Sequence, residues 1–150
     1  MGQRGEIWVA VQAVLLVVFI ALPSGGAPWP YETAFRVAGW MIAALGVLLL
    51  GRSALNLGRS LTPLPRPKPD GELVTSGAYR FVRHPIYLGV LLACLGVSLA
   101  TTSPLRLGLT FILFIFFDMK ARKEERWLAE RYPEYARYRQ RVKKLIPWIY

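Results

Sequence analysis

The chain has 150 residues, of which 54% are hydrophobic, and its formal net charge is +10. That length gives room for a single domain, 1–150, and the hydrophobic fraction is too high for an ordinary soluble domain of this size. Most of the basic residues lie in two stretches, 52–83 and 120–144, which flank apolar runs. This distribution favours membrane lipids over nucleic acid as partners. The single cysteine, Cys94, excludes a disulfide framework.

Four apolar runs have the composition of membrane-spanning helices. They are Ile7 to Leu22, Phe35 to Leu50, Ile86 to Ala100 and Pro104 to Phe117. Each is shorter than the roughly 20 residues of a comfortable span, so we expect the helices to continue into flanking polar residues, the fourth through Asp118 towards Glu130. Ser103 and Pro104 are typical of a helix start, because serine can cap free amides and proline is tolerated in the first turn. The predicted fold class is all-α: an integral membrane bundle of about four transmembrane helices with a cytoplasmic C-terminal helical tail.

The loops between these runs predict the orientation of the chain. Pro23 to Ala34 and Thr101 to Ser103 are nearly uncharged, whereas Gly51 to Pro85 and the C-terminal tail are rich in lysine and arginine. The positive-inside rule therefore puts the first two loops outside and the other two segments in the cytoplasm. We expect a multi-pass protein with both termini in the cytoplasm.

Two further features concern the packing of these segments. Thr62 to Gly71 is rich in proline, which indicates an extended, stiff connector, and we expect it to be a strap and not a site. In the third run, small residues recur at spacings that let a neighbouring helix approach closely. These residues are Gly89, Ala93, Gly96 and Ala100.

Two polar clusters adjoin the expected cytoplasmic face. Gly77 to Gly89 leads into the third run and places His84, the only histidine, at a helix cap, where free amides could face an anion. Lys120 to Leu128 follows the fourth run, and a short turn makes the two helices antiparallel neighbours, so the clusters can meet. The pocket would suit a zwitterionic or anionic ligand whose partner arrives from the lipid, and one histidine without clustered cysteines argues against a metal. Its side chains would be Arg83, Arg122, His84, Glu124, Glu125, Tyr79 and Tyr87.

The same clusters carry a family resemblance. The run Arg83-His84-Pro85-Ile86-Tyr87-Leu88-Gly89 resembles the Arg-His-Pro-x-Tyr-x-Gly signature of the isoprenylcysteine carboxyl methyltransferase and phospholipid methyltransferase superfamily. The second half resembles the family's Glu-Glu-x-x-Leu, Tyr-x-x-Tyr and Ile-Pro motifs. These matches are Glu124 to Leu128, Tyr135 to Tyr138 and Ile146-Pro147. The resemblance covers Gly71 to Pro147, with the motifs in the family's order.

The resemblance implies an enzyme that binds S-adenosyl-L-methionine at the cytoplasmic membrane face. In the family, the histidine and tyrosine of the first motif and the glutamate of the second contact the cofactor, which implies His84, Tyr87 and Glu125 here. Supporting positions are Arg83, Gly89, Glu124 and Leu128, and Tyr135 and Tyr138 would close the pocket. Residues 71–147 would then be the cofactor-binding catalytic region, preceded by an N-terminal helical hairpin and proline-rich connector in residues 1–70.

The implied reaction needs orientation and desolvation but no metal or covalent nucleophile, because a sulfonium leaving group is already activated. A carboxylate acceptor needs a cation to hold it, a catalytic role that we assign to Arg83 or Arg122. We expect carboxyl O-methylation of a lipophilic, isoprenylcysteine-like acceptor from the bilayer. Three alternatives stay open: a phospholipid or amine N-methyltransferase, an NADPH-dependent membrane reductase, and a non-enzymatic scaffold that binds anionic lipid.

Overall fold

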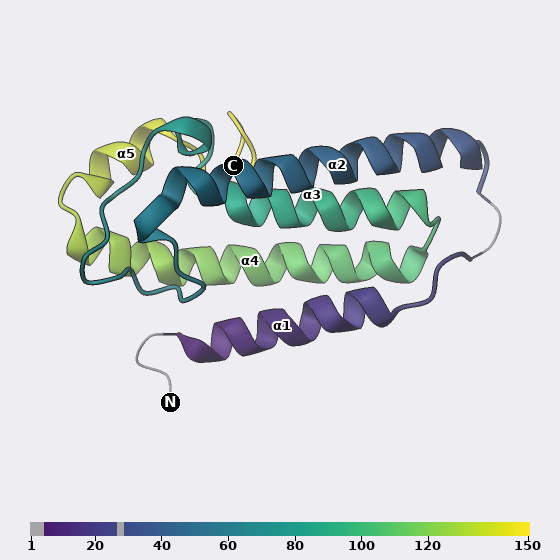
Figure 1. The fold of residues 1–150 in the computed structure, drawn as a ribbon, viewed down its shortest axis with the longest axis horizontal. Helices are drawn as coiled ribbons and strands as arrows, with labels where there is room; N and C mark the ends of the chain where they lie inside the picture. The colour runs from purple at the N-terminus through teal and green to yellow at the C-terminus, as the bar shows by residue number, and fades with distance from the viewer. Residues whose placement is uncertain (1–4, 27–28) are drawn as a thin grey trace.

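The fold is described here from a computed structural model, for residues 5–26 and 29–150. Within these ranges the chain is helical and contains no strand, which confirms the all-α class (Figure 1). The elements are α1 (Glu6–Ala21), α2 (Glu32–Leu57), α3 (Pro85–Ala100), α4 (Pro104–Arg131) and α5 (Tyr135–Arg141), with 3-10 turns η1 (Gly58–Ser60) and η2 (Gly77–Arg80). Residues 27 and 28 of the expected exterior loop lie outside the described residues.

Two helices extend beyond their apolar runs. Helix α4 starts at Pro104, capped by the Ser103 hydroxyl, and passes through Asp118 to Arg131, as the sequence predicts. Helix α2 continues past Leu50 to Leu57. Within the described ranges, the segment from α2 into η1 is the one helix that is long and apolar enough to cross a bilayer, whereas α1 and α3 are shorter apolar helices. The number of four spans therefore stays a prediction.

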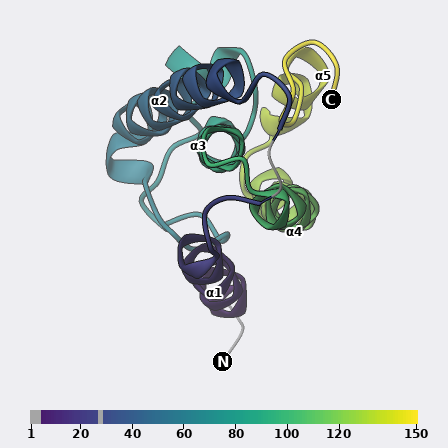
Figure 2. The same ribbon diagram turned by 90° about the vertical axis from the view of Figure 1, so that its right-hand side faces the viewer.

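The four long helices pack in the order α2, α3, α4, α1, so that α3 lies between α2 and α4 (Figure 2). The expected N-terminal hairpin is not the packing unit, because α1 packs against α4 and α2 packs against α3. The ring centroids of Trp8 and Phe116 are 5.6 Å apart, and Phe19 joins the buried core of α3 and α4. Bulky side chains thus hold α1 against α4, whereas the small residues of α2 pack against α3.

Glycines set the short distance between α2 and α3. A Cβ added at Gly89 would lie 2.8 Å from the amide nitrogen of Leu50, and one at Gly46 would lie 2.7 Å from the carbonyl oxygen of Gly89. Gly39 and Gly96 form a second close backbone contact further along the same two helices. The backbones meet without intervening side chains, as the spacing of small residues in the third run predicts.

The outer faces of the bundle are apolar. Large hydrophobic side chains such as Ile20, Leu48 and Phe111 are each more than half exposed. Soluble monomers rarely expose contiguous apolar patches of this extent. This surface, together with the apolar helix α2, is that of a protein embedded in lipid.

Gly46→Ala tests the α2–α3 contact, with Gly51→Ala in the same helix as its control, since nothing lies within 4 Å of a Cβ at Gly51. Overpacking costs about 1–3 kcal/mol, so the detergent-solubilised Gly46→Ala protein should melt several degrees below the parent. Gly51→Ala should melt at or above the parent temperature, because alanine favours a helix. Equal melting temperatures for the two variants would contradict the close packing.

Candidate active site

The first polar cluster is held by the C-terminal tail. Helix α3 begins at Pro85, with His84 at its N-cap and Pro85 in its first turn. The backbone amides of Arg83 and His84 donate to the carbonyl oxygens of Lys143 and Lys144, at 2.8 and 3.1 Å. The tail therefore fixes the start of α3, and these two amides are not free to face an anion.

A buried ion-paired cluster joins α3, α4 and the tail. His84 Nε2 lies 3.1 Å from Glu125 Oε1, and Arg83 donates to the same oxygen from Nε at 2.9 Å. Arg83 also donates to the backbone carbonyls of Val142 and Arg139. The side chains of Arg83, His84 and Glu125 are each less than a tenth exposed. The structure thus brings together the two motifs that the sequence places at the same end of neighbouring helices.

The protonation state of this cluster follows from its surroundings. Burial by itself raises the pKa of Glu125, but the hydrogen bond and charge of His84 and the charge of Arg83 outweigh it and hold that pKa at about 2. Glu125 is therefore ionised at neutral pH and can only accept hydrogen bonds. It follows that His84 Nε2 carries a proton.

Glu124 has a different environment from its neighbour. Its Oε2 accepts a 2.7 Å hydrogen bond from the Tyr87 hydroxyl and lies 3.7 Å from His84 Nδ1. The Tyr87 ring stacks on the imidazole with centroids 5.3 Å apart, and on Phe117 from the other side at 4.8 Å. The Glu124 side chain is 26% exposed. It is therefore oriented but remains open to a ligand.

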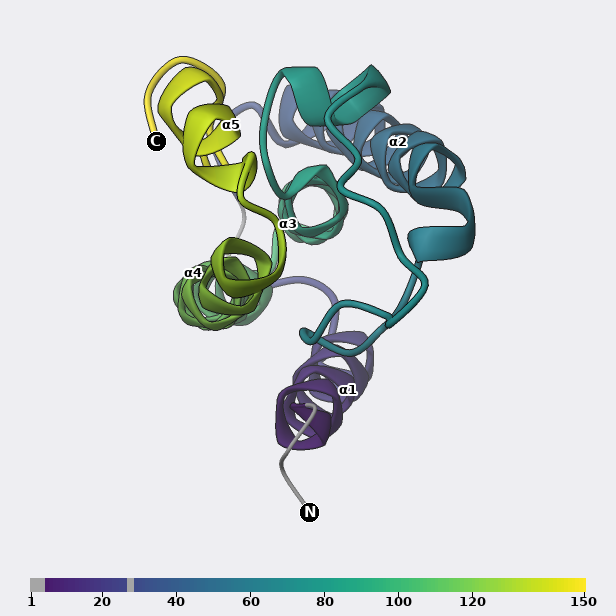
Figure 3. The ribbon, with the colours of Figure 1, turned by 90° about the vertical axis from the view of Figure 1, so that its left-hand side faces the viewer.

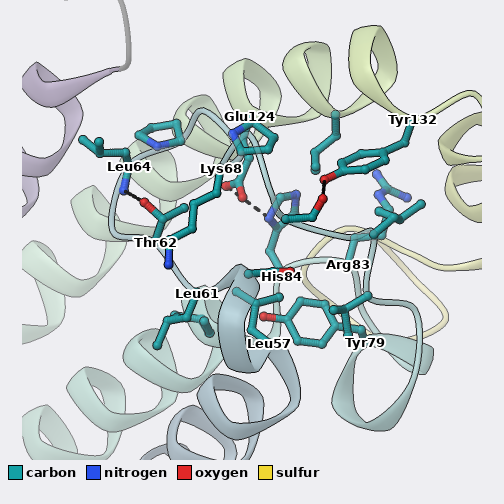
Figure 4. Close-up of a pocket in the computed structure, with 18 of the residues that line it drawn as sticks. Leu57, Leu61, Thr62, Leu64, Lys68, Tyr79, Arg83, His84, Glu124 and Tyr132 are labelled. Atoms are coloured by element: carbon teal, nitrogen blue, oxygen red, sulfur yellow. Dashed lines mark hydrogen bonds and ion pairs between the residues drawn. The ribbon is translucent and has the colours of Figure 1, made fainter.

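A cavity of about 380 Å³ opens beside His84 and Glu124 (Figure 4). One wall is polar and comes from η2, α3, α4 and α5. The opposite wall comes from the end of α2 and the proline-rich connector, whose lining residues include Leu57, Leu61, Thr62, Leu64 and Lys68. The connector, expected to be a strap and not a site, thus lines the cavity together with segments that follow residue 71. Leu64, an apolar residue between two prolines of the connector, was the available signal.

Tyrosines close the cavity from the side of the tail. The Tyr138 hydroxyl donates to the Tyr79 carbonyl oxygen and the Tyr132 hydroxyl to the Gly71 carbonyl oxygen, both at 2.6 Å. Tyr135 is buried and lines the cavity, but its hydroxyl has no hydrogen-bond partner among the described residues. Burial raises the pKa of both Tyr135 and Tyr138, so both are neutral phenols. A buried hydroxyl without a partner is costly, which suits a site that a ligand completes.

Three side chains on one face of α4 line the cavity: Lys120, Glu124 and Leu128. They are spaced four residues apart, so they share a helix face. Lys120 is 2% exposed, and its Nζ donates to Gln12 Oε1 of α1 at 2.6 Å. The motifs of the sequence do not single out Lys120, although its spacing of four residues from Glu124 places both on one helix face.

Two predicted site residues lie elsewhere. Arg122 is on another face of α4, where its Nε donates to Asp118 at 2.7 Å and its side chain is 61% exposed. Residues two apart on a helix point in roughly opposite directions, so Arg122 does not line the cavity that Lys120 lines. Gly89 lies in the α2–α3 contact, where its missing side chain admits a helix backbone.

Comparison with known proteins adds to this geometry. The family model described as phospholipid methyltransferase matches residues 34–135, more than half of the chain. The chain belongs to the phospholipid methyltransferase family. The matched region runs from the start of α2 to the buried Tyr135, and so includes the connector, the ion-paired cluster and most of the cavity wall.

Family members with known names are similar over most of this chain. The protein-S-isoprenylcysteine O-methyltransferase of Saccharomyces cerevisiae is 32% identical over 117 residues, which cover 75% of this chain and 49% of that protein. Methanethiol S-methyltransferase 1 of Bradyrhizobium diazoefficiens is 33% identical over 121 residues, covering 74% and 39% respectively. The chain thus spans about half or less of the length of these relatives.

A solved structure shares the fold. The eukaryotic intramembrane Ras methyltransferase, isoprenylcysteine carboxyl methyltransferase, superposes with a TM-score of 0.69 at 24% identity, over 96% of this chain and 52% of that one. The helical arrangement described above is therefore an arrangement found in an intramembrane protein.

Glu125→Gln should destabilise the protein by about 3 kcal/mol, because it leaves the buried Arg83 without its ionic partner. The pKa of Glu125 lies below its ordinary value of 4.5, so the carboxylate stabilises the fold above pH 4.5, and this contribution is lost as the pH falls towards 2. Between neutral pH and about pH 2, the melting temperature of the parent should fall more steeply than that of Glu125→Gln. The exposed Glu130, changed to Gln, is the control; parallel pH profiles for parent and Glu125→Gln would refute the assignment.

Proposed function

We propose that this protein is an S-adenosyl-L-methionine-dependent methyltransferase that acts on a lipophilic acceptor resident in the membrane. The observation that carries the proposal is the 380 Å³ cavity at the end of an apolar bundle, with Glu124 and His84 on one wall and the leucines of the connector on the other. Family membership supports the reaction class, and the relatives named above are methyltransferases. Neither the reductase nor the scaffold alternative has comparable support.

The residues present fit the proposed cofactor. A cavity of this volume lies within the range of small-molecule sites. Its polar lining includes the carboxylate of Glu124 and the hydroxyl of Tyr135, which has no hydrogen-bond partner among the described residues. A carboxylate suits a ligand that carries positive charge, and a phenol can donate to or accept from ribose, carboxylate or adenine groups. His84, Tyr87, Glu124 and Tyr135 would hold the cofactor, with Leu128 and Tyr138 as neighbouring walls.

S-adenosyl-L-methionine supplies a methyl group that is already activated by a positive sulfonium. The protein's task is then to orient two reactants and exclude water. Glu125 and Arg83 fix His84 against rotation, and the stacked Tyr87 fixes Glu124. The tyrosines and the connector cover the reactants. Glu125 would act through His84 and Arg83 rather than by contact, because it does not line the cavity.

The acceptor that we favour is a carboxylate, as in an isoprenylcysteine-like substrate. Lys120 is a buried cation that lines the cavity, and its only hydrogen bond among the described residues is to Gln12. An ammonium in that position would hold an anionic acceptor and oppose a cationic one. This role, assigned from the sequence to Arg83 or Arg122, fits Lys120 better, because Arg83 is committed to Glu125 and Arg122 lies outside the cavity.

The cavity would receive such an acceptor from the bilayer. Its apolar wall is formed by the end of α2 and the connector, and Gln12 of α1 also lines the cavity. Helices α1 and α2 present exposed apolar side chains along their lengths. We propose four membrane-spanning helices, with the cavity and both termini at the cytoplasmic face, since the basic segments lie at that end.

Calorimetric titration of the detergent-solubilised protein with S-adenosyl-L-methionine tests the cofactor site. Tyr135→Phe removes a hydroxyl that has no partner among the described residues, so it should leave the melting temperature unchanged or raised while weakening binding about tenfold. Glu124→Gln should weaken binding by a similar factor. Tyr31→Phe is the matched control, because Tyr31 is 84% exposed. Full affinity in both site variants would reject the site, and binding of NADPH in its place would favour the reductase.

Incubation with a labelled methyl donor and membrane lipid extract tests the acceptor. A carboxyl acceptor gives an ester, which base hydrolyses to release labelled methanol, whereas an N-methyl amine or a thioether survives the same treatment. Lys120→Gln should lower the rate about tenfold or more if the lysine holds a carboxylate, and should leave the affinity for the donor largely intact. A base-stable product would exclude O-methylation and favour an amine or thiol acceptor.

A further inference from the structure

A second cavity, of about 390 Å³, lies on another side of α4 and is lined mainly by cations. Arg122 and Arg126 reach it from α4, Arg139 from α5, and Lys144 from the tail. The one carboxylate that lines it, Glu125, is already paired with Arg83 and His84. The cavity thus has a net positive charge that the residues around it do not neutralise, which favours an anionic ligand.

The cations of this cavity are unequally committed. Lys144 Nζ and Arg122 Nε both bind Asp118, at 2.8 and 2.7 Å, and Tyr150 donates its hydroxyl to the same carboxylate. Arg126 has no hydrogen bond or ion pair with any described residue, and the Nε of Arg139 lies 3.9 Å from Glu125 Oε2. The guanidinium groups of Arg126 and Arg139 are therefore the cations most available to a ligand, whereas Arg122 and Lys144 are held by Asp118.

The same face of α4 becomes apolar below the cavity. Three or four residues apart, Arg126, Arg122, Met119, Ile115 and Ile112 share one face of the helix. Of these, Met119, Ile115 and Ile112 are 53%, 46% and 51% exposed. Figure 2 shows no described helix on the side of α4 that faces away from α3. A basic cavity thus lies directly above an uncovered apolar stripe on one helix.

The expected depth of Arg122 and Arg126 in the bilayer indicates which anion the cavity would bind. The apolar part of α4 ends at Phe117, and Arg122 and Arg126 lie about 6 and 12 Å beyond Asp118 at about 1.5 Å per residue. Long arginine side chains at this level reach the phosphate layer. We propose that this basic cavity binds the phosphate of an anionic phospholipid, whose acyl chain lies along Ile112, Ile115 and Met119. A second copy of the chain fits less well, because pairing this face with itself would oppose two basic clusters.

The site shares one residue, Glu125, with the ion-paired cluster of Arg83 and His84. Glu125 uses Oε1 for His84 and Arg83, while its Oε2 is the atom nearest Arg139. If a bound phosphate drew Arg139 away, Glu125 would keep only its contacts with His84 and Arg83. Lipid binding is nevertheless independent of the proposed methyl transfer, since it requires neither cofactor nor acceptor.

Native mass spectrometry of the detergent-solubilised protein, titrated with phosphatidylglycerol, tests this site. The parent should retain one lipid molecule, and Arg126→Ala/Arg139→Ala should bind it about tenfold more weakly, since each basic residue near the surface strengthens binding of anionic lipid. The matched control is Arg137→Ala/Arg141→Ala, which removes the same charge from exposed positions of α5 outside both cavities. If both double variants lost the same lipid affinity, the loss would come from net charge alone, and the site would be rejected.

Two further arms separate the lipid from other occupants. Glycerol phosphate at the same concentration should bind far more weakly than the lipid; equal binding would mean a free-anion site and overturn the lipid assignment. Ile115→Asn should weaken lipid retention while leaving glycerol phosphate binding unchanged, because it acts on the acyl chain. A dimer mass that disappears in Arg126→Ala/Arg139→Ala would instead make this face an interface between copies.

Discussion

The buried carboxylate of Glu125 is the constraint on which the site depends. It lies at the end of an apolar bundle, where an unpaired charge would be costly, and is held by Arg83 and His84. Arg83 in turn bonds the tail at Val142 and Arg139. One carboxylate therefore links the start of α3, the end of α4 and the C-terminal tail. The cavity has its polar wall only when all three segments are in place.

The spacing of the helices determines what can cover that wall. Because glycines bring α2 against α3, the extension of α2 to Leu57 ends beside the polar clusters, and the connector crosses from there towards α1 before returning to η2 (Figure 3). Proline keeps this segment extended without helix or sheet, so it can serve as a wall. Close packing far from the site thus gives the cavity its apolar side.

The parts of this arrangement that the sequence predicts are those fixed by local rules. Apolar runs predict the helices, and the short turn before Pro104 brings His84 and Glu125 to the same end of neighbouring helices. The partner of α1 is different, because Gln12 and Lys120 are 108 residues apart and only tertiary packing joins them. The sequence-based choice of Arg122 as the acceptor-holding cation did not consider helical phase, which places Lys120 and not Arg122 on the cavity face of α4 with Glu124.

In the proposed function, the two walls of the cavity have different tasks: the polar wall holds the cofactor and the apolar wall receives the acceptor. The polar wall comes from the motifs in residues 71–147, and its groups are oriented by one another, as Tyr87 orients Glu124. The apolar wall comes from the connector and α2, and Lys120 is oriented from α1. A different acceptor would therefore require changes in the connector, the end of α2 or Lys120, and these changes would leave the ion-paired cluster intact.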